Sequence, residues 1–228
     1  MTFSIAGRCA RTGMFGVAIT TSSICVGARC PHARAGVGAV ATQNITDPHL
    51  ATLVLDRLEA GDRATDALNA VTSGREHISY RQLTVVDKNG NRAHFTGENI
   101  LGTNTISEGD DCVAAGNLLS SVEVPVAMAE KFSTCAELHL ADRLLTALEA
   151  GIAAGGEEGP VHSAALYVAH EQPFALVDLR VDWEDNGKDG PVRKLREIWT
   201  AYEPQMNDYL TRALNPSDAP SYGVAGDP

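Results

Sequence analysis

The chain has 228 residues, of which 44% are hydrophobic and 21% are charged, a composition typical of a globular domain with a sizeable buried core. Its formal net charge of −11 argues against a nucleic-acid partner, which would require a basic surface. No apolar run approaches the roughly 20 residues that span a bilayer, and no signal peptide precedes the first apolar stretch. We therefore expect a cytoplasmic protein with no membrane partner.

The first 43 residues predict three strands, at 3–6, 15–21 and 37–42. The intervening segment 22–35 is too polar and irregular for one strand, and we interpret it as a strand end followed by a loop. Asp47-Pro48 then predicts a helix start, because Asp caps a helix and Pro suits its first turn.

The rest of the chain alternates between groups of strands and pairs of helices. Asn89-Gly90 is the clearest hairpin signal, because both residues accept the positive φ values of a tight turn. Apolar periodicity and turn residues predict helices at 48–61, 62–74, 122–131, 136–148 and 191–203, and strands at 81–87, 93–97, 112–117, 164–168 and 174–179. A short helix is expected to resume after Pro204 and end at Leu214.

This order predicts an α+β domain in which two sheets pack face to face with helix pairs outside them. The domain is expected to cover residues 1–214, including the carboxyl-terminal helix from about residue 190. Residues 215–228 are rich in Pro, Gly, Ser and Asp and are predicted to form a mobile tail. Trp199 and Tyr202 lie on the apolar face of the terminal helix, which favours homo-oligomerisation.

Thr2 is the first candidate functional residue. A small residue at this position permits removal of Met1, which leaves Thr2 with a free α-amine beside its own hydroxyl. An amine with a pKa of about 8 can accept the hydroxyl proton near neutral pH, whereas a peptide nitrogen cannot. Taken alone, this signal is weak, because Thr at position two is common.

Several segments resemble one family when taken together and in order. They are 2–5, 35–43, 80–83, 95–97, 115–119 and 163–166, and the resemblance runs from Thr2 to about Leu195. The family is an uncharacterised prokaryotic one, domain of unknown function 1028, related to the N-terminal-nucleophile (Ntn) hydrolases. The resemblance implies a four-layer αββα sandwich. It also implies hydrolysis of an amide bond, with Thr2 as nucleophile and no cofactor or metal.

The remaining site residues are assigned as neighbours of Thr2. Backbone and amide donors that could stabilise an oxyanion are expected from Gly116-Asn117 and from Thr42-Gln43. Asn117 is equally well explained as a turn residue that tolerates an unusual backbone angle.

Three further positions are candidates for substrate binding. Ser22 and Ser23 end the second strand and could line the same pocket, although such residues more often face solvent. Arg81 could bind an anionic substrate group, against the simpler interpretation of a surface ion pair. His32 stands where the family pattern has an aromatic residue after Pro31, so it is either a binding group or a plain surface histidine.

Two other interpretations stay open. The fold could be a binding or assembly module without catalysis. Alternatively, Cys25 or Cys30 could act as a nucleophile with His32. The five cysteines are irregularly spaced and predict reduced, mostly buried thiols without a metal site: Cys9, Cys25, Cys30, Cys112 and Cys135. The leading hypothesis is a hydrolase of a small-molecule amide, with Thr2 as its nucleophile.

Overall fold

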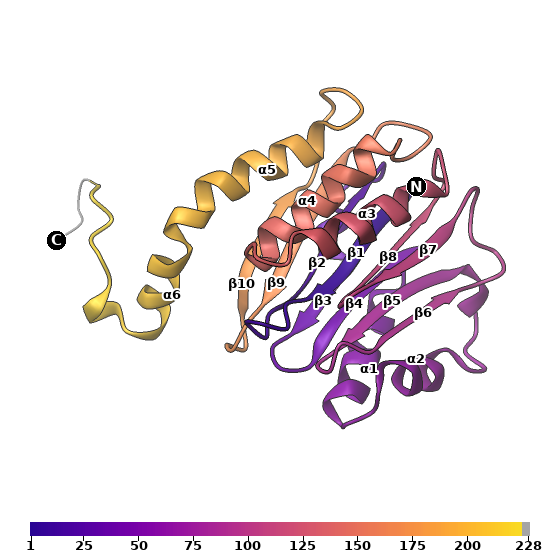
Figure 1. Ribbon diagram of the computed structural model, residues 1–228, viewed down its shortest axis with the longest axis horizontal. Coiled ribbons are helices and arrows are strands. Elements are labelled where there is room, and N and C mark those ends of the chain that lie inside the picture. The colour runs from indigo at the N-terminus through magenta and orange to yellow at the C-terminus, as the bar shows by residue number, and fades with distance from the viewer. Residues whose placement is uncertain (225–228) are drawn as a thin grey trace.

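The computed structural model describes residues 1–224 and builds them around two antiparallel sheets (Figure 1). The larger sheet has the order β10-β9-β2-β1-β8-β7, and the smaller has the order β3-β4-β5-β6. The strands are β1 (Thr2–Arg8), β2 (Phe15–Thr21), β3 (Pro31–Arg34), β4 (Gly38–Asn44), β5 (Arg81–Asp87), β6 (Arg92–Thr96), β7 (Thr105–Gly109), β8 (Cys112–Asn117), β9 (Ser163–Ala169) and β10 (Ala175–Val181). The predicted α+β class is confirmed.

Helices cover the outer face of each sheet. The helices are α1 (Pro48–Glu59), α2 (Ala64–Thr72), α3 (Glu123–Thr134), α4 (Leu140–Ala153), α5 (Gly190–Tyr202) and α6 (Met206–Leu214). α1 packs on β4 and α2 on β5 and β6, whereas α3 and α4 pack on the larger sheet and α5 packs on β9 and β10. The inner faces of the two sheets contact each other through β1, β2 and β8 on one side and β3, β4 and β5 on the other.

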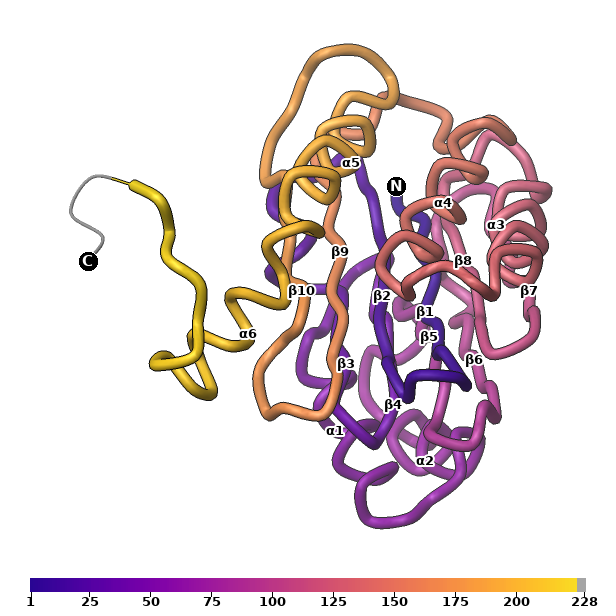
Figure 2. The backbone as a smooth tube through the Cα atoms, turned by 60° about the vertical axis from the view of Figure 1, so that its left-hand side comes forward, coloured from indigo at the N-terminus to yellow at the C-terminus, as the bar shows by residue number. Residues whose placement is uncertain are grey.

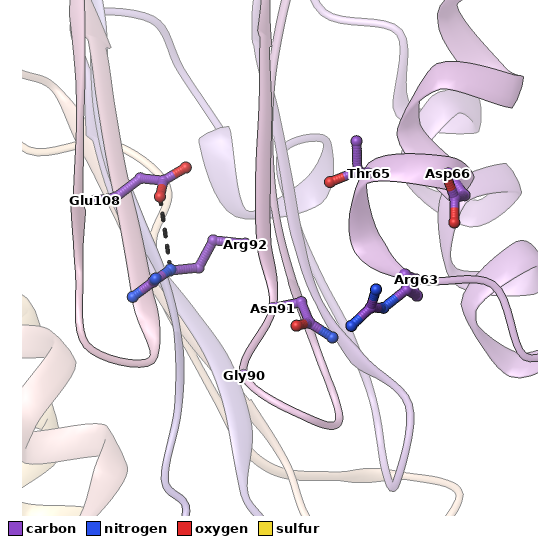
Figure 3. A pocket seen from close by; sticks show the side chains of 7 residues that line it. All are labelled: Arg63, Thr65, Asp66, Gly90, Asn91, Arg92 and Glu108. Atoms are coloured by element: carbon purple, nitrogen blue, oxygen red, sulfur yellow. Dashed lines mark ion pairs between the residues drawn. The ribbon is translucent and has the colours of Figure 1, made fainter.

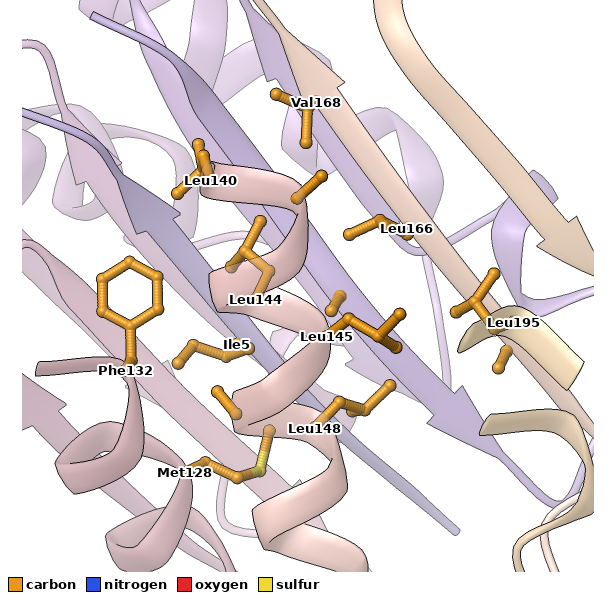
Figure 4. Packing of buried hydrophobic residues seen from close by; sticks show 14 of the residues in the cluster. Ile5, Met128, Phe132, Leu140, Leu144, Leu145, Leu148, Leu166, Val168 and Leu195 are labelled. Carbon is orange, nitrogen blue, oxygen red and sulfur yellow. The ribbon is translucent and has the colours of Figure 1, made fainter. Parts of the chain in front are cut away.

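The sequence explains why these faces are buried. Along β1, Phe3 and Ile5 point into the core beneath α3 and α4, while Ala6 points into the separate core between the sheets. Figure 4 shows Leu144, Leu145 and Leu148 of α4 directed onto the strands of the larger sheet. Each fully buried side chain of this size contributes about 2 kcal/mol to the free energy of unfolding. The helix layer is thereby fixed on β1, which carries Thr2.

Two short strands differ from the sequence-based expectation. β3 lies within the segment 22–35 that was interpreted as strand end and loop, and β7 was not predicted. Both are edge strands with half-buried side chains, so neither has the apolar run that identifies a central strand. β3 also begins with Pro31, which an edge strand tolerates because its first residue need not donate a hydrogen bond.

The terminal helix packs within its own chain. Trp199 is buried against the core of the larger sheet, and the Tyr202 hydroxyl donates a 3.0 Å hydrogen bond to the Leu176 carbonyl. The apolar face of α5 is therefore already covered, which removes the reason given for self-association. Oligomeric state stays a prediction.

The segment after α5 leads away from the sheets (Figure 2). It includes α6, which follows the predicted break at Pro204, and a short turn at Pro216–Asp218. Part of the predicted mobile tail, residues 225–228, lies outside the described residues. In the part of the chain that is described, no helix combines the length and the apolar character needed to cross a bilayer.

Candidate active site

A row of small polar side chains crosses the larger sheet at the start of β1. Thr2 is paired with Thr21 of β2 on one side and with Asn117 of β8 on the other, and Thr21 is paired in turn with Ser163 of β9. Directly paired residues in antiparallel strands project from the same face, with Cβ atoms about 5 Å apart. Thr2 therefore stands in the middle of a row of two hydroxyls and one amide, all facing the smaller sheet.

The Thr2 hydroxyl is in contact with the residue before it. Thr2 Oγ1 donates a 2.6 Å hydrogen bond to the carbonyl oxygen of Met1 and lies 3.0 Å from Thr21 Oγ1. Thr21 Oγ1 donates to the same carbonyl oxygen. Two hydroxyls thus hold the carbonyl of Met1 at the end of the sheet, and Thr2 itself is 6% exposed.

A buried chain of amides joins the two sheets beside this row. Ser4 Oγ donates to Gln43 Oε1 at 2.6 Å, and Gln43 Nε2 donates to Gln82 Oε1 at 2.8 Å. Gln82 Oε1 also accepts a 3.4 Å hydrogen bond from Asn117 Nδ2. Among the described residues, Asn117 Oδ1 has no hydrogen-bond partner. These contacts fix Gln43 and Asn117 on the face of the sheets to which Thr2 belongs.

Glu157 lies at the same end of the molecule, in the segment between α4 and β9. Its backbone bridges to Leu119, two residues after Asn117, and its side chain is fully buried. Neither carboxyl oxygen has a hydrogen-bond partner among residues 1–224. Burial raises the pKa of Glu157 to about 8, an effect that the positive amino terminus and the backbone amide of Ser22 only partly offset. The Ser22 amide lowers the pKa of Glu157 although its position does not meet the geometry of a hydrogen bond to the carboxyl.

Several predicted site residues project away from Thr2. Thr42 and Arg81 alternate with Gln43 and Gln82 along β4 and β5, so they face α1 and α2 on the outer side of the smaller sheet. Thr42 Oγ1 accordingly donates to the Asp47 carbonyl at 3.4 Å, and the Arg81 guanidinium donates to the Ile45 carbonyl.

Of the other predicted residues, His32 and Gly116 project away from Thr2, whereas Ser22 and Ser23 lie at its end of the sheets. His32 is paired with Val40 and shares its outward face, and burial lowers the pKa of His32. Gly116 turns toward the helices, where a Cβ would lie 2.6 Å from Leu119 Cδ2, and only its carbonyl accepts a 3.3 Å bond from Gln82. Ser22 is half-buried beside Glu157, and the exposed Ser23 has its Oγ 3.4 Å from Thr21 Oγ1.

The cysteine alternative lacks the required contact. His32 Nδ1 is 3.3 Å from the backbone oxygen of Cys30, whereas the Cys30 thiol lies 3.6 Å from Thr46 Oγ1. Burial raises the pKa of the Cys30 thiol and thereby disfavours the thiolate. Cys25 is half-buried, with a left-handed backbone at φ 56°. Within the described residues, no cluster of three or more His, Cys, Asp or Glu side chains could hold a metal ion.

A polar surface hollow lies at the opposite end of the sheets from Thr2. Figure 3 shows Arg63, near the start of α2, directed toward Asn91 of the β5–β6 hairpin, whereas Arg92 points away from α2 toward Glu108. The Arg92 guanidinium is 3.6 Å from Glu108 and donates a 2.6 Å hydrogen bond to the Gly109 carbonyl. Of the charged residues that line this hollow, Arg92 and Glu108 are paired with each other, and no residue of the Thr2 row belongs to its lining.

The sequence-based reasoning missed Thr21, Gln82 and Glu157. Thr21 and Gln82 sit in strands that were correctly predicted. The register of β1 with β2 places Thr21 beside Thr2, and the packing of the two sheets places Gln82 beside Asn117. Glu157 follows Gly155-Gly156 in a segment interpreted only as a helix end. A sequence signal did exist there, because a carboxylate next to two glycines can be placed close to a backbone.

Comparisons with known proteins include a strong structural match. The crystal structure of protein SPO2555 from Silicibacter pomeroyi is 32% identical, covers 88% of each chain and superposes with a TM-score of 0.79. Anbu (ancestral beta-subunit) from Yersinia bercovieri is 10% identical over 91% of this chain and 97% of its own, with a TM-score of 0.38, too low to establish a common fold. No curated protein matches. The model of the Family of unknown function (DUF1028) matches residues 2–195, and the chain therefore belongs to this family.

Proposed function

We propose that this protein is an Ntn-type amidohydrolase that cleaves a small amide with Thr2 as nucleophile, after Met1 has been removed. The observation that carries the proposal is the position of Thr2: its hydroxyl is at the start of a central strand, in a polar row between two sheets. The packing of helix pairs on the outer faces of two contacting sheets supports the finer assignment of the fold as an αββα sandwich.

The chemistry follows from the groups that surround Thr2. Removing Met1 turns the Thr2 nitrogen into an amine on the carbon next to the one that bears the hydroxyl. The amine takes the proton as Oγ1 attacks the substrate carbonyl, and then gives it to the departing amine, which leaves an ester on Thr2. Water hydrolyses this ester, releasing the acid and restoring the hydroxyl.

Two neighbouring groups suit the charge that develops during attack. The Thr21 hydroxyl already donates to a carbonyl oxygen in this position, that of Met1. Asn117 Nδ2 carries two N–H groups and in the structure donates a hydrogen bond of 3.4 Å to Gln82, so it is available as a second donor. Both donors are neutral, so they stabilise an oxyanion without raising the pKa of the nearby amine in the way that a carboxylate would.

The test uses protein made without an amino-terminal tag. Intact mass should show that Met1 is absent, and a panel of small chromogenic anilides should be hydrolysed. Thr2→Ala should lower kcat/KM by at least about a thousandfold, the scale lost when a nucleophile is removed. Thr20→Ala is the matched control, because Thr20 lies on the same sheet but bonds to the Ser163 carbonyl on the helix side. Retention of Met1, or hydrolysis that survives Thr2→Ala, contradicts the proposal.

A further inference from the structure

Glu157 is a fully buried carboxyl whose two oxygens lack hydrogen-bond partners in the described part of the chain. Buried ionisable groups in folded proteins are normally paired, because an unpaired charge in the interior costs several kcal/mol. The position of Glu157 makes its lack of a partner informative. Its backbone is bridged to Leu119, two residues after Asn117 of the Thr2 row, and the positive amino terminus is near enough to offset part of the rise that burial causes in its pKa.

Met1 extends from the Thr2 row to the surface. Its carbonyl oxygen accepts hydrogen bonds from the hydroxyls of Thr2 and Thr21. Its positive amino group lowers the pKa of Glu157. Its side chain reaches Gly159, where Met1 Cε lies 3.3 Å from the position that a Cβ would take. Gly159 also lines a surface hollow of about 320 Å³, together with Glu158, Pro160, Asp185, Gly187 and Lys188.

Met1 therefore shows what fits at this place. It is an α-aminoacyl group: a carbonyl bound by two hydroxyls, an ammonium near a carboxyl, and an unbranched side chain leading toward an open hollow. When Met1 is removed, the amino terminus moves back by one residue, about 3.5 Å along the strand. The carbonyl, the ammonium and the side chain that occupied the site all leave, and Glu157 loses the ammonium near it.

We propose that Glu157 binds the α-ammonium group of the substrate, and that the substrate is an α-aminoacyl amide whose acyl part fills the space vacated by Met1. The inference rests on the proposed role of Thr2 as nucleophile. Thr2 Oγ1 forms a bond to the substrate carbonyl carbon, the C–N bond breaks, and the hydroxyl proton leaves with the amine. Water then cleaves the ester and a free amino acid is released.

This assignment separates recognition from catalysis. Glu157 binds a group that does not react, so it is a specificity residue, and its loss should weaken binding more than turnover. A substrate with an acetylated amine lacks the charge that Glu157 recognises, and it must also place an added acetyl group in a closed part of the site. A free α-amine should therefore be required.

Binding is measured first, by calorimetry on protein whose loss of Met1 is verified by intact mass. The probes are L-methionine, which is the product implied by the fit of Met1, and N-acetyl-L-methionine. We expect L-methionine to bind, the acetylated probe to bind at least about tenfold more weakly, and Glu157→Gln to weaken L-methionine binding at least about tenfold. Glu130→Gln, at an exposed position of α3 that belongs to neither the Thr2 row nor the hollow, should bind as the wild type does.

Hydrolysis of L-methionine p-nitroanilide then separates this inference from the proposed function. We expect Glu157→Gln to raise KM at least about tenfold with a smaller change in kcat, and Thr2→Ala to abolish turnover. Binding that depends on Glu157 without any turnover would refute the catalytic proposal alone. Turnover with equal preference for free and acetylated amines, or unaltered binding by Glu157→Gln, overturns the role of Glu157. If Glu157→Gln does not fold, Glu157→Asp, which withdraws the carboxyl by one methylene, should weaken L-methionine binding, and unaltered binding by it overturns the role of Glu157.

Discussion

The pH dependence of stability should change when Glu157 is replaced by Gln. In the folded chain the pKa of Glu157 is raised to about 8, from a reference value of 4.5, chiefly by burial. Below the lower value the carboxyl is protonated in both states. Between the two values the folded state holds a proton that the unfolded state releases, so the free energy of unfolding falls as pH rises, and the loss is complete above the higher value.

The size of the effect follows from the shift. Each pKa unit corresponds to about 1.4 kcal/mol, and roughly three units of the shift lie between pH 5 and pH 8.5. The wild type should therefore lose up to about 4 kcal/mol more over this range than Glu157→Gln, which has no charge to bury. All other titrating groups are shared by the two proteins, and their contributions cancel in the comparison. At the acidic end, where Glu157 is neutral, the two proteins should have similar stability.

Urea unfolding at several pH values, followed by circular dichroism, measures this difference directly. Glu158→Gln is the matched control, because it removes the same charge from the adjacent exposed position and should follow the wild type. Parallel curves for wild type and Glu157→Gln across the range would refute the reasoning. That result would mean that Glu157 is solvated or paired in solution and carries no burial penalty.

Three further predictions concern the scaffold and the thiols. Gln82→Leu removes the acceptor of Gln43 Nε2 and should lower the free energy of unfolding by about 2–3 kcal/mol in urea; a loss below about 0.5 kcal/mol would show that the buried amides find other partners. Gly38→Ala places a Cβ 2.5 Å from the Val86 carbonyl oxygen and should lower the free energy of unfolding by about 1–3 kcal/mol, as measured by thermal unfolding. Gly159→Ala is the control: its Cβ meets only the flexible end of Met1, so the free energy of unfolding should fall far less. Iodoacetamide should label the native protein at Cys25 alone, because the other four cysteines are buried, and mass spectrometry showing labelling of any of those four first would contradict this packing.

The central elements could be predicted from the sequence because their signals are local. Asp47 caps α1 with a 3.1 Å bond from the His49 amide, and Gly90 takes a φ of 80° in the β5–β6 hairpin, as the residue types require. The order of strands and helix pairs then restricts the packing, because each apolar face must be covered. Edge strands such as β7 escaped detection, since half of their surface stays in contact with solvent and their residues show no apolar alternation.

The candidate site could be predicted only in part, because it depends on which face each residue takes. Thr42 and Gln43 are adjacent and were assigned to the same pocket, yet successive strand residues point in opposite directions and only Gln43 faces Thr2. The same alternation places Arg81 outside and Gln82 inside. Composition and spacing do not fix this choice. It is set by which face of the smaller sheet packs against β1 and β8, and this packing is made by contacts between residues far apart in sequence.

The distribution of unsatisfied polar atoms supports a functional role for the end of the sheets where Thr2 lies. Between residues 1 and 224, buried polar atoms without a hydrogen bond include Asn117 Oδ1, both oxygens of Glu157, Thr84 Oγ1 and His139 Nε2. Those of Asp62 and Arg92 lie within 4 Å of an oppositely charged partner, and His162 Nδ1 lies 3.4 Å from Asp185 Oδ1. Each unpaired buried group lowers stability by about 1–3 kcal/mol. The fold pairs its buried amides in a continuous chain, yet the unpaired atoms of Asn117 and Glu157 lie at the end of the sheets that carries Thr2, where they lower stability. A ligand whose polar groups face these atoms would recover that loss on binding, which is the physical reason to seek the substrate there and not in the charged hollow beside α2.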